Sequence, residues 1–233
     1  MRLIITILMA WCLSMGAHAA AAPDAKQIAQ ELEQAKAAKN LPNQAETVEA
    51  LQAALNALDE RNASLERAKQ YQQSIDNYPK LSETLRQQLN NVRDEPQKVP
   101  EGLTSDALNQ EILQVSSQLL EKSRQAQQEQ ERTREIADSL SQLPQQQTDA
   151  RRQLNEVERR AGAQNASGSP LTQAQQFSAQ AESARLKALV DELELAQLSA
   201  SNRQELSRLR GELAQKQSQQ LDSYLQALRN QLN

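Results

Sequence analysis

The sequence predicts an all-α protein: an elongated antiparallel helical bundle, or a set of coiled-coil hairpins, after a cleaved signal peptide. Three observations predict this fold class. Gln, Ala, Leu, Glu and Arg, which favour helices, dominate the chain. Apolar residues recur at alternating steps of three and four, the spacing of one face of a helix. Only 2% of the residues are aromatic, too few to fill a thick core, so the apolar side chains are expected to line narrow seams between helices.

The first residues have the three parts of a secretory signal peptide. Arg2 is followed by the apolar run Leu3–Leu13 and by the small residues Ala17 and Ala19 of an A-x-A motif, so we expect cleavage between Ala19 and Ala20. An uncleaved membrane anchor is the alternative. We favour the signal peptide because the run has only about half of the ~20 apolar residues that a spanning helix needs.

Removal of the signal peptide would also remove residues on which much enzyme chemistry depends. Cys12 is the only cysteine and His18 the only histidine, and both precede the expected cleavage site. Cys12 also follows Trp11 inside the apolar run, so we do not expect a lipoprotein anchor. A chain without thiol or imidazole has no disulfide, no thiolate metal site and no Ser-His or Cys-His pair. We therefore predict no enzyme activity, no catalytic, cofactor-binding or metal-binding residue, and no small-molecule substrate.

Charged residues are interspersed along the chain, and the net charge is −4. Nucleic acid is therefore not an expected partner. The acidic clusters at 129–131 and 191–194 suggest the paired carboxylates of a glycosidase. Helical spacing, however, brings acidic groups together on any charged helix, and a single phenylalanine offers little stacking surface for a sugar. A solvated helix face is the better interpretation.

Turn and cap signals divide the remaining chain into about seven helical segments. The first, at 23–39, is short and ends at a turn at 40–43. The second begins near residue 44 and is expected to end at Asn77-Tyr78-Pro79, because proline disfavours a helical residue before it. A third segment follows, and a loop at 94–103 closes it.

The second and third segments carry apolar seams. Asn62 is the one polar member of the second: a buried asparagine would fix the register of a coiled coil, whereas a solvated one, which we favour, would lie at the edge. The two seams comprise Val48, Leu51, Leu55, Leu58, Asn62 and Leu65, and then Leu81, Leu85, Leu89 and Val92.

We expect the longest helix to begin near Thr104, a helix cap followed by Asp106 in the first turn. About 40 residues would make a rod of roughly 60 Å, and Pro144 would break or kink it. Polar residues from Lys122 to Thr133 interrupt its seam, which favours tight packing near the ends and loose or wet packing between them. The apolar seam residues expected to pack are Leu108, Ile112, Val115, Leu119, Ile136 and Leu140.

The fifth segment, 145–161, carries the arginine pairs 151–152 and 159–160. These pairs could bind an anionic surface, but acidic residues within helical reach favour a solvated, salt-bridged face. A flexible linker follows at 162–169, and Ser169 and Pro170 have the pattern of a helix cap and first turn.

The last two segments are expected to be separated at Ser199-Ala200-Ser201-Asn202, where Ser201 and Gln204 have the spacing of a capping box. The seam residues of the last helix include Leu206, Leu209 and Leu213. Its pattern still runs at Asn233, so we expect the chain to be part of a longer one.

Long stretches of this sequence resemble one known family. They are DALNQEILQVSSQLL at 106–120, QLPQQQTDARRQLN at 142–155 and SARLKALVDELELAQLS at 183–199, and the likeness begins in the signal at MRLIIT. In these stretches the chain resembles the N-terminal periplasmic region of the large enterobacterial members of the small-conductance mechanosensitive channel (MscS) superfamily. The likeness covers nearly the whole chain.

The resemblance implies an inner-membrane homo-oligomer, a heptamer, that opens under membrane tension to relieve hypo-osmotic stress. Residues 1–19 would be the signal peptide, and 20–233 a periplasmic helical domain, the porin-like region of the family, truncated at its C-terminal end. The pore and gating residues of the family have no counterparts here, so we expect no channel activity from this fragment alone. It would reach the inner membrane through the missing C-terminal part.

Composition and periodicity leave a second function open: a free-standing periplasmic coiled-coil adaptor, chaperone or cell-wall scaffold. Reading the gene past Asn233 separates the two. Further coiled coil followed by transmembrane segments would support the channel, and a stop codon would support the free-standing protein.

Overall fold

The computed structural model describes residues 22–92, 97–163 and 168–233. The expected signal peptide, with Ala17, Ala19 and Ala20, lies outside these residues. The described residues form four α-helices and no strand, which confirms the all-α prediction. The helices are α1 (Ala25–Ala37), α2 (Gln44–Asn91), α3 (Ser105–Ala163) and α4 (Pro170–Leu232).

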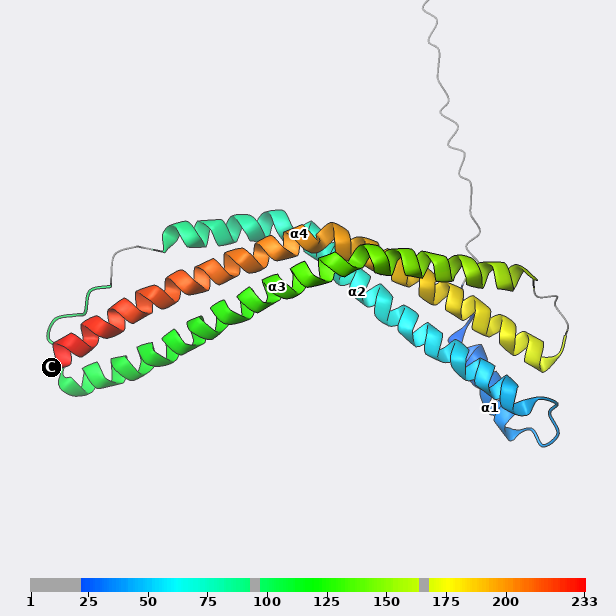
Figure 1. Ribbon diagram of the computed structural model, residues 1–233. Coiled ribbons are helices and arrows are strands. Elements are labelled where there is room, and N and C mark those ends of the chain that lie inside the picture. The colour runs from blue at the N-terminus through cyan, green and yellow to red at the C-terminus, as the bar shows by residue number, and fades with distance from the viewer. Residues whose placement is uncertain (1–21, 93–96, 164–167) are drawn as a thin grey trace, which may run out of the picture.

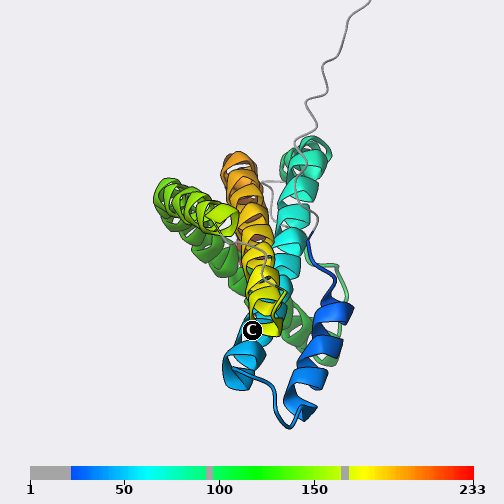
Figure 2. The same cartoon turned by 90° about the vertical axis from the view of Figure 1, so that its right-hand side faces the viewer.

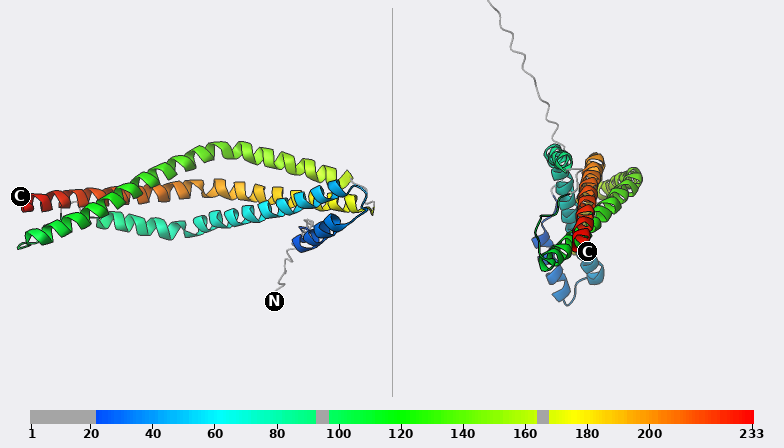
Figure 3. Two further views of the ribbon diagram at one scale, coloured as in Figure 1. Left: turned by 90° about the horizontal axis from the view of Figure 1, so that it is seen from below. Right: turned by 90° about the vertical axis from the view of Figure 1, so that its left-hand side faces the viewer.

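The three long helices lie side by side in an elongated, bent rod (Figure 1). α2 and α4 run in one direction and α3 in the other, and α1 folds back on the beginning of α2 at the end opposite the C-terminus (Figure 3). α4 packs along both α2 and α3, whereas within the described residues α2 and α3 make no comparable contact with each other. The view along the rod shows the same order, with α4 between its two neighbours (Figure 2). α4 is therefore the central helix of the fold, against which the other two long helices pack.

The helix ends that the sequence predicts are confirmed at three places. The Asn43 residue adopts a left-handed conformation (φ 54°) in the turn before α2, and the side-chain amide of Gln44 donates to the Ala35 carbonyl at 2.7 Å. The Thr104 hydroxyl accepts a hydrogen bond from the Ala107 amide at 3.3 Å before α3. The Ser169 hydroxyl accepts from the Thr172 amide at 3.2 Å, and Pro170 is the first residue of α4.

The predicted helix end at Pro79 is wrong, because α2 runs through it. α3 also runs through Pro144, so of the two alternatives predicted there the break is wrong. An interior proline removes one backbone hydrogen bond and costs about 3 kcal/mol. Each of these helices packs along α4 over many turns, and this packing outweighs the local cost. A proline inside a helix ordinarily bends it, and Figure 1 shows that α2 and α3 both curve along the rod.

The predicted break at Ser199–Asn202 is also wrong, because α4 continues through it. Ser199 and Ala200 are buried, and the Ser199 hydroxyl donates to the Ala196 carbonyl of the same helix at 3.3 Å. These small residues allow neighbouring helices to approach instead of ending the helix. α4 therefore has 63 residues, a length of about 95 Å at ~1.5 Å per residue, and it, rather than the helix that begins near Thr104, is the longest.

Three apolar clusters lie along the rod in the described residues, and further buried apolar side chains, such as Leu186, Leu206 and Leu209, lie outside them. The first joins α1, the beginning of α2 and the beginning of α4, around Ile28, Leu51 and Ala181. The second lies in the middle, around Leu143 and Leu193. The third joins the beginning of α3 to the end of α4, and its buried members are Leu108, Val115, Tyr224, Leu225 and Leu228.

The seam predicted for α2 is correct at its beginning and wrong after Leu58. Leu51 and Leu58 are buried, but Leu65 is exposed, and the buried positions that follow are Ser64 and Ala68. The buried positions Ala54, Ala68 and Ser82 are spaced by multiples of seven, so the face of α2 that is buried after Leu58 is a stripe of small residues beside the predicted leucines. Asn62 is exposed, as in the solvated alternative.

Gly211 marks a close approach between α4 and α3. A Cβ atom built on Gly211 would lie 3.4 Å from the Glu129 Cβ, which is ordinary van der Waals contact. The predicted loose packing around Lys122 to Thr133 is therefore not uniform: α3 touches α4 at Glu129, and a cavity opens beside it toward α2.

We expect Gly211→Ala to raise the free energy of unfolding by about 0.5–1 kcal/mol, because alanine favours an interior helix position over glycine by that amount and its methyl group fits. Gly211→Leu is expected to lower it by about 1–3 kcal/mol, because the longer side chain must separate the two helices. Urea denaturation followed by circular dichroism measures both. Equal effects of the two substitutions would contradict the close approach.

Candidate functional site: a polar cavity between the three long helices

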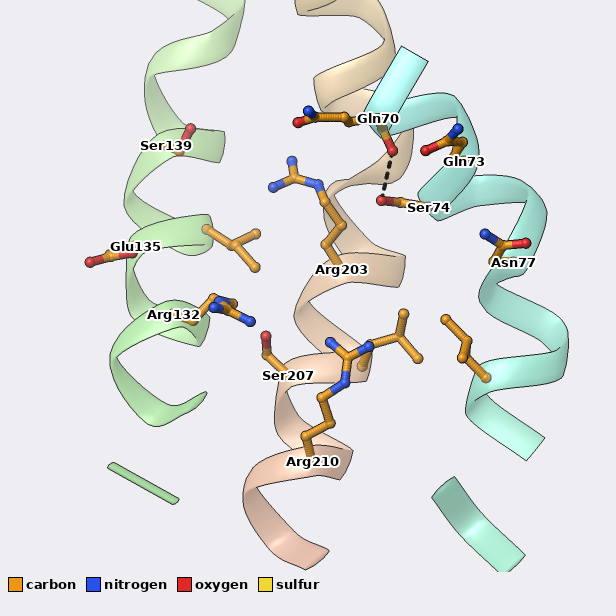
Figure 4. Close-up of a pocket in the computed structure, with 13 residues that line it drawn as sticks. Gln70, Gln73, Ser74, Asn77, Arg132, Glu135, Ser139, Arg203, Ser207 and Arg210 are labelled. Carbon is orange, nitrogen blue, oxygen red and sulfur yellow. Dashed lines mark hydrogen bonds between the residues drawn. The ribbon is translucent and has the colours of Figure 1, made fainter. Parts of the chain in front are cut away.

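A cavity of about 620 Å³ lies between α2, α3 and α4. Its lining includes the apolar side chains of Ile136 and Leu206, which are buried, and of Leu81, which is exposed. The rest of the lining is polar, and Figure 4 shows three arginines around it: Arg132 from α3, and Arg203 and Arg210 from α4. The cavity exists because α4 packs against both neighbours while α2 and α3 stay apart.

Arg203 is held on the α2 side of the cavity by neutral groups. Its guanidinium carbon lies 4.7 Å from the centre of the Tyr71 ring, a cation-π contact. Its Nε donates to the Ser199 hydroxyl and its Nη2 to the Ala196 carbonyl, both at 3.0 Å. Burial lowers the pKa of Arg203, and no carboxylate of the described residues pairs with it. Its charge is therefore not neutralised locally.

Ser207 and Arg210 lie one and two turns further along α4. Ser207 is 1% exposed, and its hydroxyl has no hydrogen-bond partner among the described residues. Arg210 is half-buried and lines this cavity as well as a second one, of about 850 Å³, beside Lys122 and Glu129. Both residues line the cavity, but the Ser207 hydroxyl itself is shielded from solvent.

The acidic groups near the cavity neutralise only part of its positive charge. Arg132 pairs with Glu129 of the same helix at 3.4 Å. The carboxylate of Glu135 points away from the cavity in Figure 4. Glu205 forms its ion pairs with Arg208 and, at 3.5 Å, with Arg86 of α2; the bond from Arg208 chiefly lowers the pKa of Glu205.

The predicted seam residues lie in two of the clusters, along this cavity and, for Leu209 and Leu213, outside both. Five of them are buried and four are partly buried. The buried ones are Leu108, Val115, Ile136, Leu206 and Leu209, and the partly buried ones are Ile112, Leu119, Leu140 and Leu213. Leu108, Ile112, Val115 and Leu119 belong to the cluster at the C-terminal end, whereas Ile136 and Leu206 line the cavity.

Sequence analysis missed Arg203 and Arg210 as a pair. Together with Ser199, Leu206 and Leu213 they follow the seam spacing of α4, with successive steps of four and three. The signal for this pair in the sequence was the presence of two arginines at seam positions of α4, where apolar residues are expected. The cavity depends on how three helices are placed relative to one another. The periodicity of one helix carries no information about that placement.

In the part of the chain that the structure describes, no group of three or more His, Cys, Asp or Glu side chains is arranged to hold a metal ion.

The four described helices include none that is both long and apolar enough to cross a membrane.

The family described as the mechanosensitive ion channel porin domain matches residues 31–233. The chain belongs to this family. The porin-domain match thus extends from α1 to the end of α4 and includes the cavity. No solved structure matches the chain.

One curated relative is the miniconductance mechanosensitive channel MscM of Escherichia coli (strain K12). It is 78% identical to this porin-domain chain over 233 residues, which is the whole of the chain and 21% of the relative. The chain therefore spans about a fifth of the length of that channel. The resemblance to MscS-type channels that the sequence indicates is confirmed.

Proposed function

We propose that this chain is the extramembrane, periplasmic helical domain of a mechanosensitive channel that opens under membrane tension in hypo-osmotic shock. The observation that carries the proposal is the 78% identity to the miniconductance channel MscM along the entire chain. Residues 20–233 would form the domain after removal of a signal peptide at 1–19. The domain would have no catalytic role, and the pore and the inner-membrane segments would belong to other parts of the channel.

The arrangement of the helices suits a mechanical element. α4 contacts both other long helices along its length, so a displacement of α4 moves all three. Its buried apolar side chains include members of the three clusters and also Leu186, Leu206 and Leu209 outside them. A helix that is packed against both neighbours along the rod can transmit a displacement from one end of the rod to the other.

The proposed channel is a homo-oligomer, a heptamer by analogy with the MscS superfamily. Two leucines on α3 support contacts between copies: Leu113 is 72% and Leu120 62% exposed, and a separation of seven residues places them on one side of the helix. Large apolar side chains that share an exposed face are typical of interaction surfaces.

A chimaera tests the proposal. The corresponding part of E. coli MscM is replaced by this chain, and currents are recorded from spheroplast patches under suction. We expect tension-gated openings from the chimaera and none from the 233-residue chain alone. In the chimaera, Gln127→Cys, at an exposed position of α3, is expected to react in intact cells with a maleimide that crosses the outer but not the inner membrane.

Ala181→Cys is the matched control for labelling, because Ala181 is fully buried and a cysteine there should stay unreacted. Labelling of Gln127→Cys only after the inner membrane is opened would contradict the periplasmic location. A chimaera that reaches the membrane but never opens under tension would contradict the assignment to the channel.

A further inference from the structure

The rod bends in its middle, and all three long helices change direction there (Figure 1). The bend lies at the level of the cavity between the helices and of the cluster around Leu143. This part of the rod, the bend section, comprises residues 70–84 of α2, 129–144 of α3 and 196–210 of α4. One arm extends from it to the cluster around Leu51, and the other arm to the cluster around Leu228.

Each of the three helices has its own local cause of bending in this section. Pro79 in α2 and Pro144 in α3 have no amide proton, so each helix lacks one backbone hydrogen bond. In α4 the Ala196 carbonyl accepts hydrogen bonds from two side chains of the same helix, the Ser199 hydroxyl at 3.3 Å and Arg203 Nη2 at 3.0 Å. Side chains that bond to a carbonyl of their own helix compete with its backbone bond and often bend the helix. Three separate weak points thus lie within one section of the rod.

Further hydroxyl groups of the bend section donate to carbonyls of their own helix. Their bonds are 2.6 to 3.1 Å long, and the residues are Ser74, Ser82 and Thr84 in α2 and Thr133 and Ser141 in α3. The Ser82 hydroxyl donates to the carbonyl of Pro79 itself. Ser116 and Ser218 make the same kind of bond in the arm near the C-terminus, but neither lies near an interior proline.

The packing of the bend section allows a change of angle at low cost. The cavity of about 620 Å³ leaves room between the helices, and most of the residues that line it are polar. Opening or closing the cavity therefore mainly exchanges contacts of polar groups with water. Separating the helices within an arm would instead expose buried leucines, and the cost of that exposure grows with the apolar area.

We propose that the bend section is a hinge at which the two arms of the rod change their angle while α4 stays helical through it. In the proposed channel, the hinge would take up a displacement of one arm without separating the helices of either arm. This role in the channel rests on the proposed function, whereas the bending itself is a property of the chain alone.

Double electron–electron resonance between spin labels on α4 tests the hinge in the 233-residue chain carrying Cys12→Ser. Gln175→Cys and Asp222→Cys place labels in different arms, and Gln175→Cys and Asp191→Cys place them in one arm; all three positions are exposed. In the double variant Pro79→Ala/Pro144→Ala, we expect the mean distance of the first pair to increase by about 3 Å or more and its distribution to narrow, because the helices straighten. The pair within one arm should not change.

Pro170→Ala is the matched control, because Pro170 lies at the first position of α4, where a proline does not bend the helix. It should leave both distance distributions unchanged, and circular dichroism verifies the folding of every variant. A distribution between the arms that is equally wide and equally centred with and without Pro79 and Pro144 would overturn the hinge.

Hydrogen exchange is a second readout that needs no substitution. We expect the backbone amides of residues 197–204 to exchange at least about tenfold faster than those of residues 181–188 of the same helix. Equal protection of the two stretches would overturn the hinge. A rigid bend in a chimaera that opens under tension would remove only the hinge, whereas a flexible bend in a chimaera that never opens would remove only the assignment to the channel.

Discussion

Replacing Leu228 with alanine is expected to lower the free energy of unfolding by about 3 kcal/mol. Leu228 is 0% exposed and lies in the cluster where the beginning of α3 meets the end of α4. Truncating a buried leucine removes its transfer free energy and leaves a cavity, which together cost about 2–5 kcal/mol. This cluster is separate from the other two, so its neighbours have little apolar material with which to refill the space. Urea denaturation followed by circular dichroism measures the change.

Leu198→Ala is the control, because it makes the same truncation on the same helix, α4, at a side chain that is 68% exposed. It should change the free energy of unfolding by less than about 0.5 kcal/mol. Hydrogen exchange adds a local test: Leu228→Ala should increase exchange mainly near the two helix ends that form this cluster. Comparable effects of the two substitutions would show that the cluster does not hold α3 to α4.

The ends of the rod could be predicted from the sequence because apolar periodicity and packing agree there. Leu108 and Val115 on α3, and Leu228 on α4, follow steps of three and four and are buried together. The caps Thr104 and Ser169 were equally predictable, since they depend only on neighbouring residues. In these regions the residue pattern of each single helix is enough to predict which of its faces is buried.

The middle of the rod could not be predicted in the same way. Pro79 and Ser199 are local signals of a helix end, and tertiary packing along α4 overrides both. Ser64 and Ala68 are buried where the leucine pattern predicts Leu65, because small residues suit a close helix contact that no single-helix pattern reveals. The cavity around Arg203 follows from the same packing, so it was visible only in the structure.

The second large effect is expected at the ion pair between Arg67 of α2 and Glu192 of α4. Arg67 donates from Nε to Oε1 at 2.6 Å and from Nη2 to Oε2 at 3.2 Å. The Glu192 side chain is only 10% exposed, whereas that of Arg67 is 50% exposed. Arg67→Ala would leave a buried carboxylate without its partner, and we expect a loss of about 2 kcal/mol, less than for a fully buried pair because water still reaches Arg67.

The pair of Arg151 on α3 and Glu194 on α4 offers a matched comparison, because it also joins two helices but its side chains are 54% and 47% exposed. Double-mutant cycles to alanine measure the coupling energy of each pair from urea denaturation. We expect about 1 kcal/mol or more between Arg67 and Glu192, and less than about 0.5 kcal/mol between Arg151 and Glu194. Replacing Arg67 and Glu192 together by leucines should cost less than Arg67→Ala alone, because no unpaired charge is left behind. A double replacement as costly as the single one would show that the buried carboxylate does not cause the loss.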